Sequence, residues 1–338
     1  MPLDPRIRSL LDARDEEIDP AEMTIARLRQ RARESINRWQ LAGVRDYDIA
    51  SSEDVYAELD GATTRLRVYQ PRVPSHSDDR KLPIVVYLHG GGWVMGDLDA
   101  YDGICRAVCE SAAAVVVSVE YRLAPEHPYP IPLQDCEQAL LWVQTNASRL
   151  GGDPSAVFIA GDSAGGNLAA VCALGLRQRL GHPLKGQILI YPATDDPSSG
   201  HPSMEEFKIG HEYGQSFSLL SRMMNLYVGD RITLSDPAFA PLRTDSLAGA
   251  PGALVITAEY DMLRDEGEAY AERLRAEGVD VVCRRFEGVN HGFMHLTKYL
   301  PATDEAFRLI GAWMRAKLAP VEGARPNALS GETNPADL

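Results

Sequence analysis

Ser163 is the side chain whose surroundings most favour chemistry in this sequence. It lies in the segment GDSAG (161–165), which has the G-x-S-x-G spacing of a serine nucleophile on a sharp turn. The apolar run AVFIAG (156–161) predicts a buried strand before it, and residues 166–180 predict a helix after it. Small residues permit a strained turn, and the helix directs its free N–H groups at the serine. We therefore predict that Ser163 is a nucleophile for acyl transfer.

The motif HGGGW (89–93) offers donors for the oxyanion that forms when a serine attacks a carbonyl carbon. It follows a predicted buried strand, PIVVYLHG (83–90). Consecutive glycines leave backbone N–H groups accessible and allow a carbonyl oxygen to approach closely. We predict that Gly91, Gly92 and Ala164 donate the hydrogen bonds of an oxyanion hole. An ordinary turn is the alternative interpretation of the glycines.

A histidine late in the chain is the expected general base. The segment FEGVNHGFMHL (286–296) contains His291 just past a predicted strand at 280–286. His295 is the alternative, and we expect it to pack in the turn or helix that follows. The two histidines have no acidic or cysteine partner at metal-ligand spacing, so we predict no metal site here.

An aspartate should lie between the serine and the histidine in the chain, at the end of another strand. In LVITAEYDMLRDEG (254–267), Asp261 is the first aspartate past the apolar run. Asp265 belongs to the next predicted helix, where we expect an exposed charge. The order Ser163, Asp261, His291 completes a predicted nucleophile–acid–base set.

Strands alternate with helices over most of the chain, a pattern typical of a mainly parallel sheet flanked by helices. The predicted strands cover residues 63–71, 83–90, 114–121, 156–161, 186–192, 251–260 and 280–286. The predicted helices cover residues 99–112, 132–148, 166–180, 263–277 and 302–318.

Two segments stand outside this alternation. Residues 1–45 are predicted to form a separate helical segment. Within it, Asp19-Pro20 is a typical helix start, and apolar residues follow at helical spacing. The apolar positions are Ile25, Leu28, Ala32, Ile36 and Trp39. An insertion at about 197–235 interrupts a domain that we expect to span 46–320, and long insertions are often functional. Residues 321–338 lack apolar periodicity and are expected to be disordered.

Composition narrows the classes of partner. The 338 residues carry a net charge of −14, which disfavours nucleic acid or an anionic membrane as a partner. The first residues contain no apolar core of a secretion signal, and the apolar runs are too short to span a membrane, so we expect a cytoplasmic protein. The five cysteines form no CxxC pair and predict reduced thiols.

These motifs together resemble those of the hormone-sensitive-lipase-like carboxylesterases within the α/β-hydrolase superfamily. The resemblance covers about residues 80–300 and depends on HGGGW, YRLAPEHPYP (121–130), GDSAGGN and DMLRDEG, with HGF at the histidine. The family commonly has Asp-Pro-Leu where this chain has Asp-Met-Leu at 261–263, which affects the loop after the acid. The resemblance implies an α/β-hydrolase fold with a helical cap built from the N-terminal helices and the insertion. It also implies hydrolysis of short- to medium-chain acyl esters without a cofactor.

The motifs decide neither which residues contact the substrate nor which of several related reactions the site performs. Bulky side chains are candidates for the substrate pocket, namely Trp93, Phe217, Met223 and Tyr227. Amidase, deacetylase or lactonase chemistry would use the same site, and a non-catalytic small-molecule receptor is a further alternative. A phosphate loop is disfavoured because Asn167 stands where its lysine is required. The apolar strand at 280–286 should form a sheet edge, which together with the resemblance suggests a homodimer.

Overall fold

The alternation of strands and helices produces a central sheet in the computed structural model. The structure describes residues 1–13, 22–41, 47–59, 61–72, 81–208, 212–297 and 299–319, without the side chains of 37–41. Within these ranges eight strands form one sheet, in the order β1-β2-β4-β3-β5-β6-β7-β8. The strands are β1 (Ile49–Leu59), β2 (Ala62–Pro71), β3 (Leu82–Leu88), β4 (Val115–Val119), β5 (Gly152–Asp162), β6 (Gly186–Ile190), β7 (Ala253–Tyr260) and β8 (Val281–Asn290). From β4 to β8 all neighbours are parallel, whereas β2 is antiparallel to both β1 and β4.

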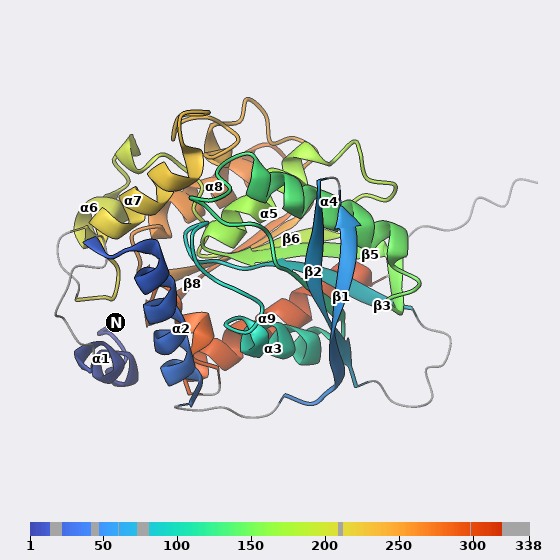
Figure 1. The fold of residues 1–338 in the computed structure, drawn as a ribbon, viewed down its shortest axis with the longest axis horizontal. Coiled ribbons are helices and arrows are strands. Elements are labelled where there is room, and N and C mark those ends of the chain that lie inside the picture. The colour runs from blue at the N-terminus through green and yellow to red at the C-terminus, as the bar shows by residue number, and fades with distance from the viewer. Residues whose placement is uncertain are drawn as a thin grey trace, which may run out of the picture.

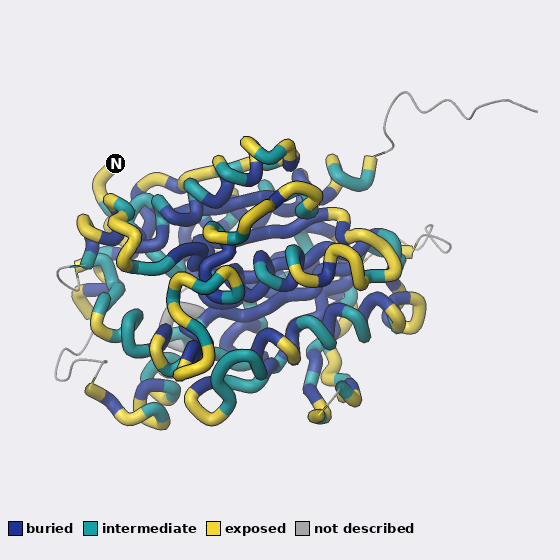
Figure 2. The backbone as a smooth tube through the Cα atoms, turned by 90° about the horizontal axis from the view of Figure 1, so that it is seen from above, coloured by how far each residue is buried: buried dark blue, intermediate teal, exposed yellow. Residues whose placement is uncertain are grey.

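Helices cover both faces of the sheet (Figure 1). Helices α3 (Asp102–Ala112) and α9 (Pro301–Leu318) pack on one face, and α4 (Ile131–Asn146), α5 (Ala164–Gly175) and α8 (Arg264–Ala276) pack on the other. Strand β3 alternates between the two cores, with Val86 in one and Val85 in the other. Because both faces are covered, most residues of the central strands are buried (Figure 2). The predicted α/β-hydrolase fold class is thus confirmed.

The N-terminal region contains α1 (Pro5–Asp12) and α2 (Ile25–Leu41). Helix α1 was not predicted; Asp4 caps it by accepting a hydrogen bond from the Arg6 N–H at 2.8 Å. Of the apolar positions predicted for α2, Leu28 is buried and Ile25, Ala32 and Ile36 are half-buried, whereas the side chain of Trp39 lies outside the described residues. The predicted helix start at Asp19-Pro20, and the tail at 321–338, lie outside the described residues.

The insertion between β6 and β7 contains α6 (Pro202–Phe207), α7 (Phe217–Val228) and two short 3₁₀ helices, η2 (Pro197–Ser199) and η3 (Pro241–Arg243). Ser216 caps α7 by accepting a hydrogen bond from the Leu219 N–H. The guanidinium of Arg222 donates to the carbonyl oxygen of Met23 at 2.7 Å, which links α7 to the segment before α2. The two segments that interrupt the alternation therefore lie side by side.

Two elements differ from the prediction. Strand β1 was missed because most of its side chains are polar and exposed or half-buried, so it lacks an apolar alternation. The helix expected at 166–180 ends at Gly175, and turns follow it. No helix in the described ranges has the length and apolar character to cross a lipid bilayer.

Candidate active site

Ser163 lies on a strained turn between β5 and α5. Its backbone has φ 54° and ψ −120°, a conformation that residues with a Cβ rarely adopt. Its N–H donates to the carbonyl oxygen of Ile190 on β6 at 2.8 Å, which fixes the turn against the sheet. A Cβ on Gly165 would collide with the carbonyl oxygen of Leu88, so glycine permits the close approach of α5 to β3. The turn therefore presents the Ser163 hydroxyl at the carboxyl edge of the sheet.

His291 and Asp261 reach Ser163 from the ends of β8 and β7. The Nε2 atom of His291 is 3.0 Å from the Ser163 Oγ atom, and its Nδ1 atom is 2.7 Å from the Asp261 Oδ2 atom. With the ring proton on Nδ1, His291 donates to Asp261 and accepts from the serine hydroxyl. Asp261 is fully buried, and the Leu263 N–H donates to its Oδ1 atom at 2.9 Å. The three predicted residues thus form one continuous chain of hydrogen bonds.

The surroundings of His291 favour its charged form. Burial alone would lower the pKa of His291, but the Asp261 carboxylate, through its charge and hydrogen bond, and the charge of Asp162 raise this pKa above its usual value. The ring of Tyr191 packs against the imidazole, with centroids 4.6 Å apart. A base whose protonated form is stabilised can accept the serine proton during attack.

Of the two alternative residues, His295 lines the same cavity as Ser163, and Asp265 lies in α8. His295 is buried in a 3₁₀ helix, η4 (Phe293–His295), edge-on to Tyr101, and burial lowers its pKa to about 4. This placement agrees with a packing role. Asp265 lies in the first turn of α8 but is half-buried rather than exposed, because it accepts a hydrogen bond from the Ser203 N–H and pairs with Arg264. The expectation of an exposed charge at Asp265 was wrong, since α6 packs over it.

The predicted oxyanion donors lie beside Ser163. Gly91 and Gly92 have φ values of 111° and 62°, and a Cβ on Gly91 would collide with the backbone of Met95. Glycine is therefore required for this loop to fold back toward the serine. No hydrogen bond within the described part of the chain uses the N–H of Gly91, Gly92 or Ala164. All three residues line the same cavity as Ser163 and His291.

Two residues that sequence reasoning left without a role brace this loop. Asp162, buried beneath it, accepts hydrogen bonds from the Gly90 N–H and the Tyr87 hydroxyl, each at 2.9 Å. Burial raises the pKa of Asp162 to about 6, although these hydrogen bonds act to lower it. From the YRLAPEHPYP motif, Tyr121 stacks on His89 and donates to its carbonyl oxygen at 2.6 Å. An acidic residue directly after the apolar run AVFIAG was the available signal for Asp162.

A cavity of about 800 Å³ opens above Ser163 between α2 and α7. Of the predicted substrate contacts, Trp93 and Met223 line it, whereas Phe217 and Tyr227 do not. Tyr227 is fully buried and stacks on Trp93, with ring centroids 4.9 Å apart. The insertion instead contributes Leu219 and Leu220, together with Gln215. The prediction for Tyr227 and Phe217 therefore needs correction: Tyr227 shares the side of α7 that carries Met223, but one turn further on it packs against Trp93.

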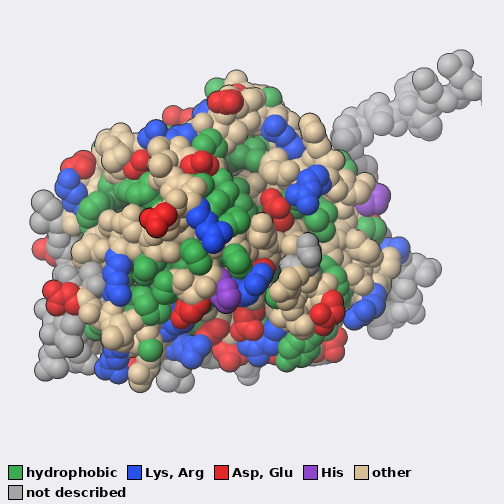
Figure 3. All heavy atoms as spheres, turned by 45° about the horizontal axis from the view of Figure 1, so that its top comes forward, with side chains coloured by type: hydrophobic (Ala, Val, Ile, Leu, Met, Phe, Trp, Pro, Cys, Tyr) green, Lys and Arg blue, Asp and Glu red, His purple; other side chains and the backbone are tan. Residues whose placement is uncertain are grey.

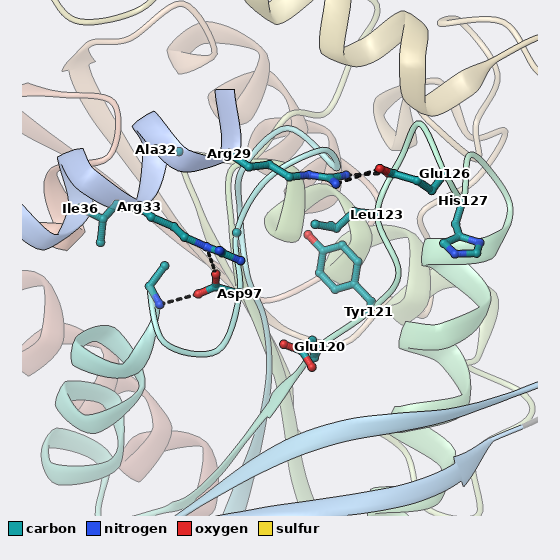
Figure 4. Close-up of a pocket in the computed structure, with 12 residues that line it drawn as sticks. Arg29, Ala32, Arg33, Ile36, Asp97, Glu120, Tyr121, Leu123, Glu126 and His127 are labelled. Carbon is teal, nitrogen blue, oxygen red and sulfur yellow. Dashed lines mark hydrogen bonds and ion pairs between the residues drawn. The ribbon is translucent and has the colours of Figure 1, made fainter. Parts of the chain in front are cut away.

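Helix α2 is held to two loops: the loop after β3, which carries the glycines, and the loop after β4 (Figure 4). Arg29 donates to the carbonyl oxygens of Val94 and Ala124 at 2.8 and 3.0 Å and forms an ion pair with Glu126 at 2.7 Å. Arg33 pairs with Asp97 at 2.6 Å. A smaller pocket of about 330 Å³ lies beneath these pairs. On the face drawn in Figure 3, acidic and basic described side chains are intermixed rather than gathered by sign.

Comparison with known proteins identifies the family. The model of a family described as alpha/beta hydrolase fold matches residues 85–295. The carboxylesterase NlhH of Mycobacterium tuberculosis is 44% identical over 245 residues, covering 71% of this chain and 74% of the relative. An arylesterase of Saccharolobus solfataricus is 32% identical over 305 residues, covering 87% and 93% of the two chains. A solved structure of a hyperthermophilic esterase from Pyrobaculum calidifontis superposes with a TM-score of 0.87 at 39% identity, covering 94% and 99%.

The chain therefore belongs to the hormone-sensitive-lipase-like esterases of the α/β-hydrolase superfamily, as the motifs predicted.

Proposed function

We propose that this protein is a serine carboxylesterase. The observation that carries the proposal is the chain of hydrogen bonds from Ser163 through His291 to Asp261 at the floor of the cavity. The carboxylesterase and arylesterase among its relatives support the same reaction class. No step of this chemistry calls for a metal or an organic cofactor.

The geometry supports the following mechanism. Ser163 Oγ attacks the acyl carbonyl carbon while His291 Nε2 accepts its proton, and the N–H groups of Gly91, Gly92 and Ala164 stabilise the oxyanion. His291 then returns the proton to the leaving alcohol, which leaves an acyl-enzyme. Water attacks this intermediate in the same way and releases the acid. Asp261 keeps the imidazole in the required tautomer and stabilises the imidazolium.

We infer that the substrates are esters of short to medium acyl chains. A Cβ on Gly92 would meet the thioether of Met223, so this side chain lies directly on the predicted oxyanion hole. Bulky apolar side chains, Leu219, Leu220 and Met223, close the cavity on the side of α7. Each buried methylene favours binding by about 0.8 kcal/mol until the chain meets this wall. Amides and lactones would use the same chemistry and are outcomes that a substrate panel separates.

The test compares purified variants on p-nitrophenyl esters of increasing length, on anilides and on lactones. We expect Ser163→Ala to reduce kcat to within about 10³–10⁴ of the uncatalysed rate. His291→Ala should match that loss, whereas His295→Ala should retain most activity. Substantial turnover by Ser163→Ala would overturn the mechanism, and a preference for anilides would replace esterase by amidase.

Three further proposals concern organisation. We propose that residues 1–45 and the insertion at about 197–235 form one cap over the catalytic domain, which the contact of Arg222 with Met23 supports. We propose that β8, at the end of the described sheet and with Val282 exposed, pairs with a second copy to form a homodimer. A monomeric mass by light scattering at micromolar concentrations would refute the dimer.

A cytoplasmic location stays a prediction.

A further inference from the structure

Gln215 is the residue through which the insertion touches the acid of the proposed triad. It lies just before α7 and lines the cavity above Ser163. Its amide Nε2 atom donates to the Asp261 Oδ1 atom at 3.0 Å, and its Oε1 atom accepts from the Met262 N–H at 2.8 Å. Both ends of one amide are therefore used on the same turn after β7, a two-point contact that fixes its orientation.

The Asp261 carboxylate depends on few donors. It is fully buried, and within the described chain three groups donate to it: His291 at Oδ2, and the Leu263 N–H and Gln215 amide at Oδ1. A buried carboxylate needs such donors, because burial removes the water that would otherwise solvate it. The two donors at Oδ1 also prevent the carboxylate from rotating away from His291.

A second contact joins the same part of the insertion to the base. The side-chain amide of Asn290, next to His291, donates to the carbonyl oxygen of Tyr213 at 2.9 Å. Residues 213–215 thus contact the ends of both β7 and β8. The relative position of the acid and the base is therefore coupled to the placement of the insertion.

We propose that Gln215 is a positioning residue that orients Asp261 for His291 and so couples the insertion to the triad. The inference rests on the proposed function. Gln215 acts through Asp261 and takes no part in proton transfer itself. Without the N–H groups of Gln215, the negative charge of the Asp261 carboxylate would be less neutralised. The carboxylate would then stabilise the charged imidazolium of His291 more strongly. At Oδ1 the carboxylate would then be held, among the described residues, by the Leu263 N–H alone, so its orientation toward His291 would be less fixed.

The test is the pH profile of ester hydrolysis by the full-length protein with Gln215→Met, which preserves side-chain length but removes both hydrogen bonds. We expect the plateau of kcat/KM to fall about tenfold, as for one lost hydrogen bond to a buried charge, with most of the loss in kcat. The acid limb of the profile should move to higher pH, because His291 holds its proton more tightly. Gln215→Asn, whose amide is one carbon shorter, should move the limb in the same direction.

Ser216→Ala is the matched control. It removes the cap of α7 in the adjacent position without touching Asp261, so it should lower thermal stability and leave the acid limb where it is in the unsubstituted protein. A loss of kcat/KM in Gln215→Met with an unmoved acid limb would show a merely structural role and overturn the proposal. An unchanged kcat/KM would overturn it as well.

A measurement without turnover separates this inference from the proposed function. The downfield proton NMR signal of the His291 Nδ1–H, followed against pH, reports the hydrogen bond to Asp261 directly. Asp162 and His295, which also act on His291, are the same in every variant. A shifted titration in Gln215→Met supports the positioning role even if no ester is hydrolysed. An identical titration refutes it even in an active esterase.

Discussion

The two segments that cover the site are attached to it in different ways. The insertion reaches inward: Gln215 contacts Asp261, Tyr213 contacts Asn290, and Met223 lies on Gly92. Helix α2 is attached at the rim, where Arg29 and Arg33 pair with Glu126 and Asp97 (Figure 4). In these pairs the side chains of Arg33 and Glu126 are 64% and 53% exposed and those of Arg29 and Asp97 are 27% and 16% exposed, whereas Asp261 is fully buried.

Because of this difference, the insertion and α2 should affect catalysis in different ways. Buried hydrogen bonds keep their strength because water does not compete for them, so the insertion is suited to setting the geometry of the acid and the base. The exposed ion pairs of α2 contribute little and are screened by salt, so the attachment of α2 depends mainly on the hydrogen bonds from Arg29 to two carbonyl oxygens. On this basis, changes in the insertion should alter chemistry and selectivity more than changes in α2.

Among changes in these two segments, the largest effect is expected from Met223→Ala. Its thioether lies on Gly92, so its removal extends the cavity directly beyond the predicted oxyanion hole. The ratio of kcat/KM for octanoate over butyrate esters should rise by about ten- to fiftyfold, because each newly buried methylene contributes about 0.8 kcal/mol. Initial rates on a series of p-nitrophenyl esters measure this ratio.

Leu28→Ala is the matched change on α2, since Leu28 is buried and lines the same cavity. Helix α2 is held at its rim and can settle into the space left by the smaller side chain. The octanoate-to-butyrate ratio should therefore change less than about threefold, well below the gain expected from newly buried methylenes. Equal shifts in both variants would contradict the distinction between the two segments.

The sequence predicted those parts of the site that depend on short-range pattern. Ser163, Asp261 and His291 each follow the apolar run of a parallel strand, so the fold alone brings them to one sheet edge. Strand β1 escaped prediction because an edge strand with polar faces carries no alternation. The fold class could therefore be predicted, whereas this element required the structure.

The contacts of the insertion were not predictable, for a different physical reason. Gln215 and Asp261 are 46 residues apart, and their hydrogen bond depends on how α6 and α7 pack. Met223 and Tyr227 are four residues apart and share one side of α7, yet Met223 lines the cavity and Tyr227 lies buried against Trp93. Periodicity identifies the face of a helix, but tertiary packing decides what each turn of that face contacts.

The smallest effects should come from the rim, where Arg29 and Arg33 provide an internal comparison. Arg29→Met removes the donor to the carbonyl oxygens of Val94, on the loop that follows Gly91 and Gly92, and of Ala124, on the loop after β4. It should lower kcat/KM about fivefold, since such hydrogen bonds contribute about 1 kcal/mol. Arg33→Met removes an exposed ion pair and should change kcat/KM less than about twofold.

Raising the salt concentration to about 0.5 M should imitate Arg33→Met but not Arg29→Met, because salt screens charge pairs and leaves hydrogen bonds to carbonyl oxygens in place. Steady-state kinetics of both variants at low and high salt measure this contrast. If Arg33→Met or salt reduced activity as much as Arg29→Met, the ion pairs rather than the carbonyl contacts would hold α2, and its attachment would be electrostatic throughout.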